Sequence, residues 1–192
     1  MLPVVEGAGD EKAVPELIRR VLQANNNYET RVLKPQRRGE LPRVRASFEN
    51  WFRVALKEQA AILWVMDFDC TSCDCAKDCA GDLYERANHI QPHWPFRVAF
   101  MVQEFETLFL AEKNATCAAL SLSQDLEFPA DPERVRDAKG WLSRKLPSGQ
   151  AYKPTVHQAK ISAQLDLSRL RAASPSFRHF EKAILQLCDT TV

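Results

Sequence analysis

A continuous apolar run at residues 61–66 constrains the fold of this chain more than any other part of its sequence. A strand that is apolar on both faces needs cover on both, which is typical of a central strand in a parallel sheet between helices. The run is far shorter than the roughly 20 apolar residues that a membrane-spanning helix needs. We therefore predict a buried strand in an α/β domain, and no membrane partner.

Strand and helix patterns alternate on both sides of this run. Further strands are predicted at residues 4–5, 28–33 and 96–102, and helices at 11–23 (capped by Asp10), 44–58, 81–90 and from 104. Their order predicts a Rossmann-like α/β fold, in which a mostly parallel sheet is flanked by helices. The remainder is predicted to be mainly helical, with helices at 132–145, 155–165 and 177–188, the last capped by Ser176. We therefore expect a core at 1–112 and a helical C-terminal part at 113–192, packed together as one compact unit.

Acidic residues follow three of the predicted strands. Glu6 follows the first strand, Asp67 and Asp69 follow the central one, and Glu104 and Glu106 follow the next. In an open parallel sheet, ligands bind outside the carboxyl ends of the strands. Two carboxylates held close together are stabilised by a cation between them, and oxygen ligands alone favour Mg²⁺ or Mn²⁺. We predict a divalent metal site at this edge, where spacing does not choose between Glu104 and Glu106.

These residues carry a resemblance to a known domain. The segment at 5–11 (Val-Glu-Gly-Ala-Gly-Asp-Glu) with a helix behind it, followed by Asp67-Phe68-Asp69 after an apolar strand, resembles the Toprim domain. That domain occurs in topoisomerases, bacterial primases, the ribonuclease that matures 5S rRNA and the overcoming-lysogenization-defect (OLD) nucleases. The chain is similar over nearly its whole length to a bacterial Toprim-like family, whose members are often encoded beside AAA/ABC-type ATPases in candidate phage-defence operons.

The Toprim resemblance implies a role for each acidic residue. Glu6 would be the general acid/base or a first metal ligand, and Asp67 and Asp69 would be metal ligands. Asp10 would hold a second ion, and Glu104 or Glu106 would complete the site. The implied reaction is hydrolysis of a phosphodiester in DNA or RNA with one or two Mg²⁺ or Mn²⁺ ions.

Basic residues could contact the phosphate of such a substrate. The candidates are Lys153, Arg171 and Arg178. The formal net charge of +1 conceals two basic segments, since residues 12–58 hold eleven Lys and Arg against five Asp and Glu, and residues 134–182 hold eleven against three. Basic segments beside an acidic site suit a polyanionic partner, although mixed solvated helix faces would give the same counts.

Four of the six cysteines lie within ten residues of one another. Cys70, Cys73, Cys75 and Cys79 offer enough thiolates for a zinc ion or an iron–sulfur cluster. Their spacing is tighter than that of paired zinc knuckles, so a reduced loop without metal is the alternative.

Three hypotheses for function follow. The first is a Mg²⁺-dependent nuclease, the effector of a phage-defence system; because the sequence lacks a Gly-x-x-x-x-Gly-Lys-Ser/Thr motif, any ATPase activity would come from a partner chain. The second is a catalytically silent Toprim-like module that docks on an ATPase. The third is a zinc or redox regulator that uses the cysteines. The N-terminal residues lack the pattern of a signal peptide, so we expect a cytoplasmic protein.

Overall fold

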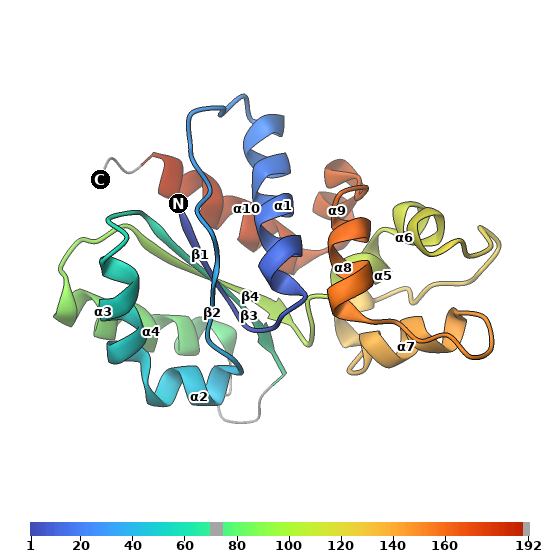
Figure 1. Cartoon of the computed structure of the whole chain (residues 1–192), viewed down its shortest axis with the longest axis horizontal. Coiled ribbons are helices and arrows are strands. Elements are labelled where there is room, and N and C mark those ends of the chain that lie inside the picture. The colour runs from blue at the N-terminus through green and yellow to red at the C-terminus, as the bar shows by residue number, and fades with distance from the viewer. Residues whose placement is uncertain (70–74, 190–192) are drawn as a thin grey trace.

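The computed structural model describes residues 1–69 and 75–189 (Figure 1). Four parallel strands form one sheet in the order β2-β1-β3-β4. Their bounds are Leu2–Val5 for β1, Gln36–Arg37 for β2, Ile62–Phe68 for β3 and Phe96–Val102 for β4. The predicted α/β fold, with a parallel Rossmann-like sheet flanked by helices, is confirmed.

Alternation along β3 divides the core into two layers. Ile62, Trp64 and Met66 pack on one side of the sheet, and Leu63 and Val65 pack on the other. Because successive side chains of a strand point to opposite faces, a strand that is apolar throughout can serve both layers. This is why residues 61–66 required helices on both sides.

Three helices cover the face on which Trp64 lies. They are α2 (Leu41–Ala46), α3 (Phe48–Leu56) and α4 (Ala76–Ile90). Phe48 is fully buried there, and its ring meets that of Trp64 edge-to-face with centroids 4.8 Å apart. Aromatic packing of this kind joins α3 to the centre of the sheet.

The opposite face is covered from both ends of the chain. The helices α1 (Asp10–Ala24) and α10 (Pro175–Cys188) pack on this side. The same apolar cluster continues through α5 (Thr107–Ala111), α6 (Lys113–Leu120), α7 (Ala138–Lys145), α8 (Pro154–Ser162) and α9 (Leu167–Ala173). The segment at 113–189 therefore shares its hydrophobic core with the sheet, and its helix α8 lies beside α1 (Figure 1).

Several predicted elements differ from the structure. The strand expected at 28–33 is wrong: this segment is irregular, Tyr28 is 75% exposed, and the second strand lies later as the two-residue β2. The helix expected at 44–58 is two helices, α2 and α3, which are separated at Ser47, a residue with the non-helical ψ of 22°.

Helix starts account for most of the other differences. The segment expected as one helix at 132–145 is a 3-10 turn at Pro132–Arg134 followed by α7, whose N-cap Asp137 accepts the Gly140 N–H. The cap of the last helix is Ser174 rather than Ser176, because the Ser174 hydroxyl accepts the Phe177 N–H at 3.0 Å.

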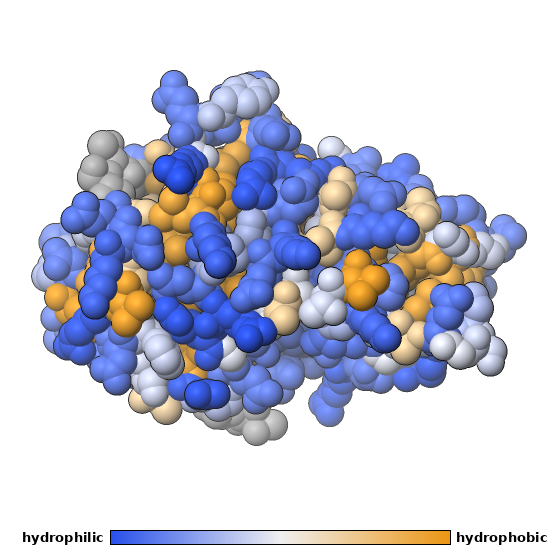
Figure 2. All heavy atoms as spheres, in the orientation of Figure 1, coloured by the Kyte–Doolittle hydropathy of each residue, from blue (hydrophilic) through white to orange (hydrophobic). Residues whose placement is uncertain are grey.

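The surface drawn in Figure 2 is mostly hydrophilic, with smaller hydrophobic areas between charged residues. None of the helices in the described ranges combines the length and the apolar character that crossing a bilayer would take.

Candidate functional site

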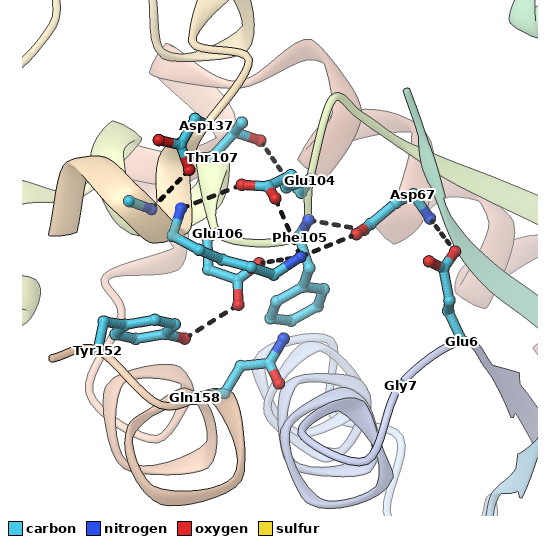
Figure 3. A network of polar contacts seen from close by, with 12 residues as sticks. Glu6, Gly7, Asp67, Glu104, Phe105, Glu106, Thr107, Asp137, Tyr152 and Gln158 are labelled. Carbon is cyan, nitrogen blue, oxygen red and sulfur yellow. Dashed lines mark hydrogen bonds and ion pairs between the residues drawn. The ribbon is translucent and has the colours of Figure 1, made fainter. Parts of the chain in front are cut away.

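The carboxyl ends of β1, β3 and β4 meet at one edge of the sheet, and predicted acidic residues lie there (Figure 3). Glu6 follows β1, whereas Asp67 lies inside β3. The Asp67 N–H donates to Glu6 Oε2 at 3.3 Å, and the Phe105 N–H, from the turn after β4, donates to Asp67 Oδ1 at 2.7 Å. Asp67 therefore connects the ends of three strands.

The turn between β1 and α1 brings Asp10 to the same region. Gly9 is the N-cap residue of α1 and Asp10 is its first residue, so the prediction that Asp10 caps this helix is wrong. Asp10 instead accepts the Gly7 N–H through Oδ2 and the side chain of Gln158 through Oδ1, both at 2.7 Å. Gly9 allows this approach, since a Cβ there would overlap Gln158 Oε1 and lie 2.7 Å from Pro154 Cβ.

Lys139, near the start of α7, supplies a cation to the site. Its Nζ lies 3.1 Å from Glu104 Oε1 and 3.5 Å from both Asp67 Oδ2 and Glu106 Oε2. Its backbone N–H also donates to Glu104 Oε2 at 3.0 Å. Sequence reasoning missed this residue: it lies in the second basic segment, but no motif or spacing distinguishes it from the other cations there.

Glu104 and Glu106 both reach the site, in different surroundings. The Glu104 side chain is 13% exposed and contacts both the ammonium and the backbone N–H of Lys139. The Glu106 side chain is fully buried. Tyr152 OH donates to Glu106 Oε1 at 3.2 Å, and Glu106 Oε2 has no hydrogen-bond partner among the described residues. Spacing could not choose between the two glutamates, and both are present at the site: Glu104 pairs with Lys139, and Glu106 lies buried beside Tyr152.

Burial dominates the electrostatics of these groups. It raises the pKa of Glu6 and the pKa of Glu106 to about 7 each, raises the pKa of Asp67 well above its usual value, and raises that of Asp10. The cause is loss of hydration, which disfavours the charged carboxylate. Burial alone would lower the pKa of Lys139, but Glu106, Asp67 and Glu104 together raise it. Lys139 is thus held as a cation beside carboxylates that resist ionisation.

A cavity of about 240 Å³ opens among these residues. It is lined by the backbone of the turn at 7–9 and by the side chains of Glu6, Asp10, Asp67, Glu106, Lys139, Pro154, Thr155 and Gln158. Asp69 is exposed and outside this lining, although its charge contributes to the raised pKa of Glu6.

The polar groups that line the cavity are mainly acidic. Within residues 1–69 and 75–189, no three His, Cys, Asp or Glu side chains are grouped so that they could hold a metal ion. The acceptors that line the cavity are nevertheless mainly carboxylate oxygens, and one of them, Glu106 Oε2, is buried without a hydrogen bond. Oxygen ligands of this kind suit Mg²⁺ or Mn²⁺.

Comparison with known protein families identifies the family of this chain. A sequence model described as "Domain of unknown function (DUF4276)" matches residues 5–185. The chain belongs to the DUF4276 family. No curated protein and no solved structure matches it. The DUF4276 match runs from β1 to α10, so Glu6, Lys139 and Gln158 all lie inside it.

None of the three phosphate-contact candidates is among the residues that line the acidic cavity of this DUF4276 chain. Arg171 forms a bidentate ion pair with Glu181, in which both N–O distances are 2.7 Å. Arg178 donates to the carbonyl oxygen of Arg171, and Lys153 is exposed beside α8. The cation that contacts the acidic residues is Lys139.

Two of the four clustered cysteines, Cys70 and Cys73, lie outside the described residues. Cys75 caps α4, because its Sγ accepts the Asp78 N–H at 3.3 Å. Cys79 is 2% exposed and packs in the hydrophobic layer around Trp64.

Proposed function

We propose that this DUF4276 protein is a metal-dependent phosphodiesterase that cleaves DNA or RNA at the cavity between Glu6, Asp67 and Lys139. One observation carries the proposal. Four carboxylates, those of Glu6, Asp10, Asp67 and Glu106, line a single small cavity, where Lys139 is the only cation among the described lining residues. Such an excess of buried acid needs protons or bound cations, and oxygen donors select hard divalent ions.

The acidic residues would divide the work of hydrolysis. Asp67 and Glu6, which are joined by a hydrogen bond, would hold a Mg²⁺ or Mn²⁺ ion together with the exposed Asp69. When bound, the ion would position a water molecule and stabilise the leaving oxygen. Glu6 has a pKa of about 7, which suits a group that exchanges a proton near neutral pH.

Lys139 would contact the substrate. Its raised pKa keeps the ammonium charged at neutral pH, and its side chain is 38% exposed beside the buried carboxylates. A cation in this position can offset the charge of a phosphate oxygen at the mouth of the cavity. In this proposal Lys139 takes the role for which Lys153, Arg171 and Arg178 were candidates.

The biological setting that we propose rests on the Toprim resemblance. The protein would be the effector of a bacterial phage-defence system and would act in the cytoplasm with an AAA/ABC-type ATPase. The partner would supply ATP hydrolysis, since this sequence has no phosphate-binding Gly-x-x-x-x-Gly-Lys-Ser/Thr motif.

Cleavage assays test the activity. Full-length protein is incubated with DNA and with RNA in Mg²⁺ or Mn²⁺, and wild type is compared with Glu6→Gln and Asp67→Asn. We expect both substitutions to abolish cleavage while leaving the circular dichroism spectrum unchanged. Glu127→Gln, at an exposed position outside the cavity lining, is the matched control and should cut normally. Normal cleavage by both site variants would refute the assignment.

The ion pairs of Lys139 favour a second candidate function. Because Lys139 already contacts Asp67, Glu104 and Glu106, the site could be neutralised by the protein itself and serve as a silent module that docks on an ATPase. This candidate predicts no heat of Mn²⁺ or Mg²⁺ binding in calorimetry, together with tight binding of the ATPase. The zinc or redox regulator is the remaining hypothesis, and elemental analysis of anaerobically purified protein tests it.

A further inference from the structure

Gln158 enters the acidic cavity from the helical C-terminal part of the chain. It lies on α8 and is 2% exposed, and its side chain points toward the network around Glu106 (Figure 3). Its Nε2 donates to Asp10 Oδ1 at 2.7 Å, a contact between residues 148 positions apart. A buried amide with a fixed partner so far along the chain is positioned by the whole fold rather than by local structure.

The side-chain amide of Gln158 has a hydrogen bond at its nitrogen and none at its oxygen among the described residues. Gln158 is among the residues that line the cavity, and its Oε1 is buried without a hydrogen-bond partner among the described residues. The amide cannot simply turn over, because its oxygen would then face the Asp10 carboxylate, which needs a donor. The close approach of Gly9 and Pro154 further restricts the side chain. The orientation of this oxygen is therefore set by its surroundings.

Glu106 provides a second buried oxygen without a hydrogen bond, although Lys139 Nζ lies 3.5 Å from it as an ion pair. Its Oε2 also has no hydrogen-bond partner in the part of the chain that the structure describes, and Glu106 lines the same cavity as Gln158 and Asp10. A buried acceptor without a donor is unfavourable, because it has given up its hydrogen bonds to water without replacing them. The Gln158 oxygen, together with the carboxylates of Asp10 and Glu106 that line the same cavity, points to a shared ligand that attracts oxygen atoms, and a hard divalent cation does so.

We propose that Gln158 Oε1 is a neutral ligand for a Mg²⁺ or Mn²⁺ ion that binds in this cavity beside Asp10 and Glu106. The proposal deepens the proposed function and rests on it for the kind of ion. It assigns the second ion to the inner part of the cavity, apart from Asp69. It assigns Glu106 rather than Glu104 to that ion, because Glu106 is among the residues that line the cavity and Glu104 is not. It also makes α8 part of the metal site, so the C-terminal helices complete the centre that begins at the strand ends.

Mn²⁺ titration by calorimetry on the full chain tests this ligand. Gln158→Met removes both amide atoms at similar size, and Gln158→Glu keeps an oxygen and adds charge. We expect Gln158→Met to weaken one Mn²⁺ site by about 10-fold or more, and Gln158→Glu to keep or tighten it. Gln164→Met, which changes an exposed glutamine just beyond α8, is the matched control and should bind as wild type does.

Two titration results would overturn the proposal. One is unchanged Mn²⁺ affinity in Gln158→Met. The other is equal weakening by both Gln158 variants, because Gln158 would then only position Asp10 through the Nε2 bond. If Gln158→Met does not fold, nuclear magnetic resonance of wild type with diamagnetic Mg²⁺ decides: Mg²⁺ should shift the side-chain carbonyl ¹³C signal of Gln158 and not that of Gln164, and an unchanged Gln158 signal would overturn the proposal.

These outcomes are separable from those of the proposed function. Gln158-dependent Mn²⁺ binding without cleavage of DNA or RNA would sustain this inference and refute the phosphodiesterase. Cleavage of DNA or RNA together with Mn²⁺ affinity that is unchanged in the Gln158 variants would support the phosphodiesterase and refute this inference.

Discussion

Substitution of Glu106 tests the electrostatic account of the cavity directly. The side chain is fully buried, and burial raises its pKa from 4.5 to about 7. A carboxyl whose pKa is raised on folding stabilises the protein below its unfolded pKa, and this contribution is lost as the pH rises through the folded pKa. The rise from 4.5 to about 7 corresponds to about 3 kcal/mol, because each pH unit is worth about 1.36 kcal/mol.

Glu106→Gln imitates the protonated carboxyl and should remove this pH dependence. We expect the variant and wild type to have similar free energies of unfolding near about pH 4, and the variant to be more stable by up to about 3 kcal/mol near about pH 8.5. For a chain of this size, that corresponds to a melting temperature about 6–12 °C higher. Thermal unfolding in the presence of a chelator, followed by circular dichroism across this range, measures the difference.

Two further measurements sharpen the result. Glu127→Gln, at an exposed position, should differ from wild type by the same small amount at every pH. Saturating Mg²⁺ near about pH 8.5 should reduce the advantage of Glu106→Gln, because a cation that binds the ionised carboxylate stabilises wild type. A difference between Glu106→Gln and wild type that does not change with pH would refute the reasoning, since Glu106 would then be ionised at no net cost.

Five other substitutions, two of them controls, have expected effects on the free energy of unfolding, each measured by urea denaturation. Lys139→Met should destabilise the protein by about 1–3 kcal/mol near neutral pH. This is less than the about 3–5 kcal/mol for losing one partner of a fully buried pair, because the Lys139 side chain is 38% exposed. Lys12→Met, at an exposed position of α1, is the control and should be near neutral. Gly9→Ala should cost about 1–3 kcal/mol by overpacking against α8, whereas Gly81→Ala, where a Cβ meets open space inside α4, should stabilise by about 0.5–1 kcal/mol. Phe48→Ala should cost about 3–5 kcal/mol because it empties a fully buried ring position, and an effect below about 1 kcal/mol would contradict the described core.

The sheet was predictable where the side chains themselves encode it. The apolar runs of β3 and β4 identified both strands, and the bounds predicted for β4 are those observed. β2 carries no such signal, because its two residues pair with β1 through the backbone and its side chains are polar. The apolar Val32 and Leu33 suggested a strand in its place, although this segment forms none.

The site was predictable to the extent that it follows strand ends. Glu6, Asp67 and Glu106 could be found because parallel strands bring their carboxyl ends together. Lys139 and Gln158 could not, since the packing of α7 and α8 against the sheet places them, and no spacing to the acidic motifs records that packing. The sequence pattern thus identified the acidic residues, whereas the tertiary structure was needed to find Lys139, which pairs with them, and Gln158, which orients Asp10.

The long separation between Asp10 and Gln158 has a consequence during protein synthesis. A ribosome that adds about 5–20 residues per second would deliver Gln158 roughly 3–10 s after Glu106. During that interval a nascent chain carries the carboxylates at the strand ends but not α8, which lines one side of the cavity. The enzyme proposed above would therefore stay inactive on the ribosome, and a truncated product ending before α8 would lack a complete centre.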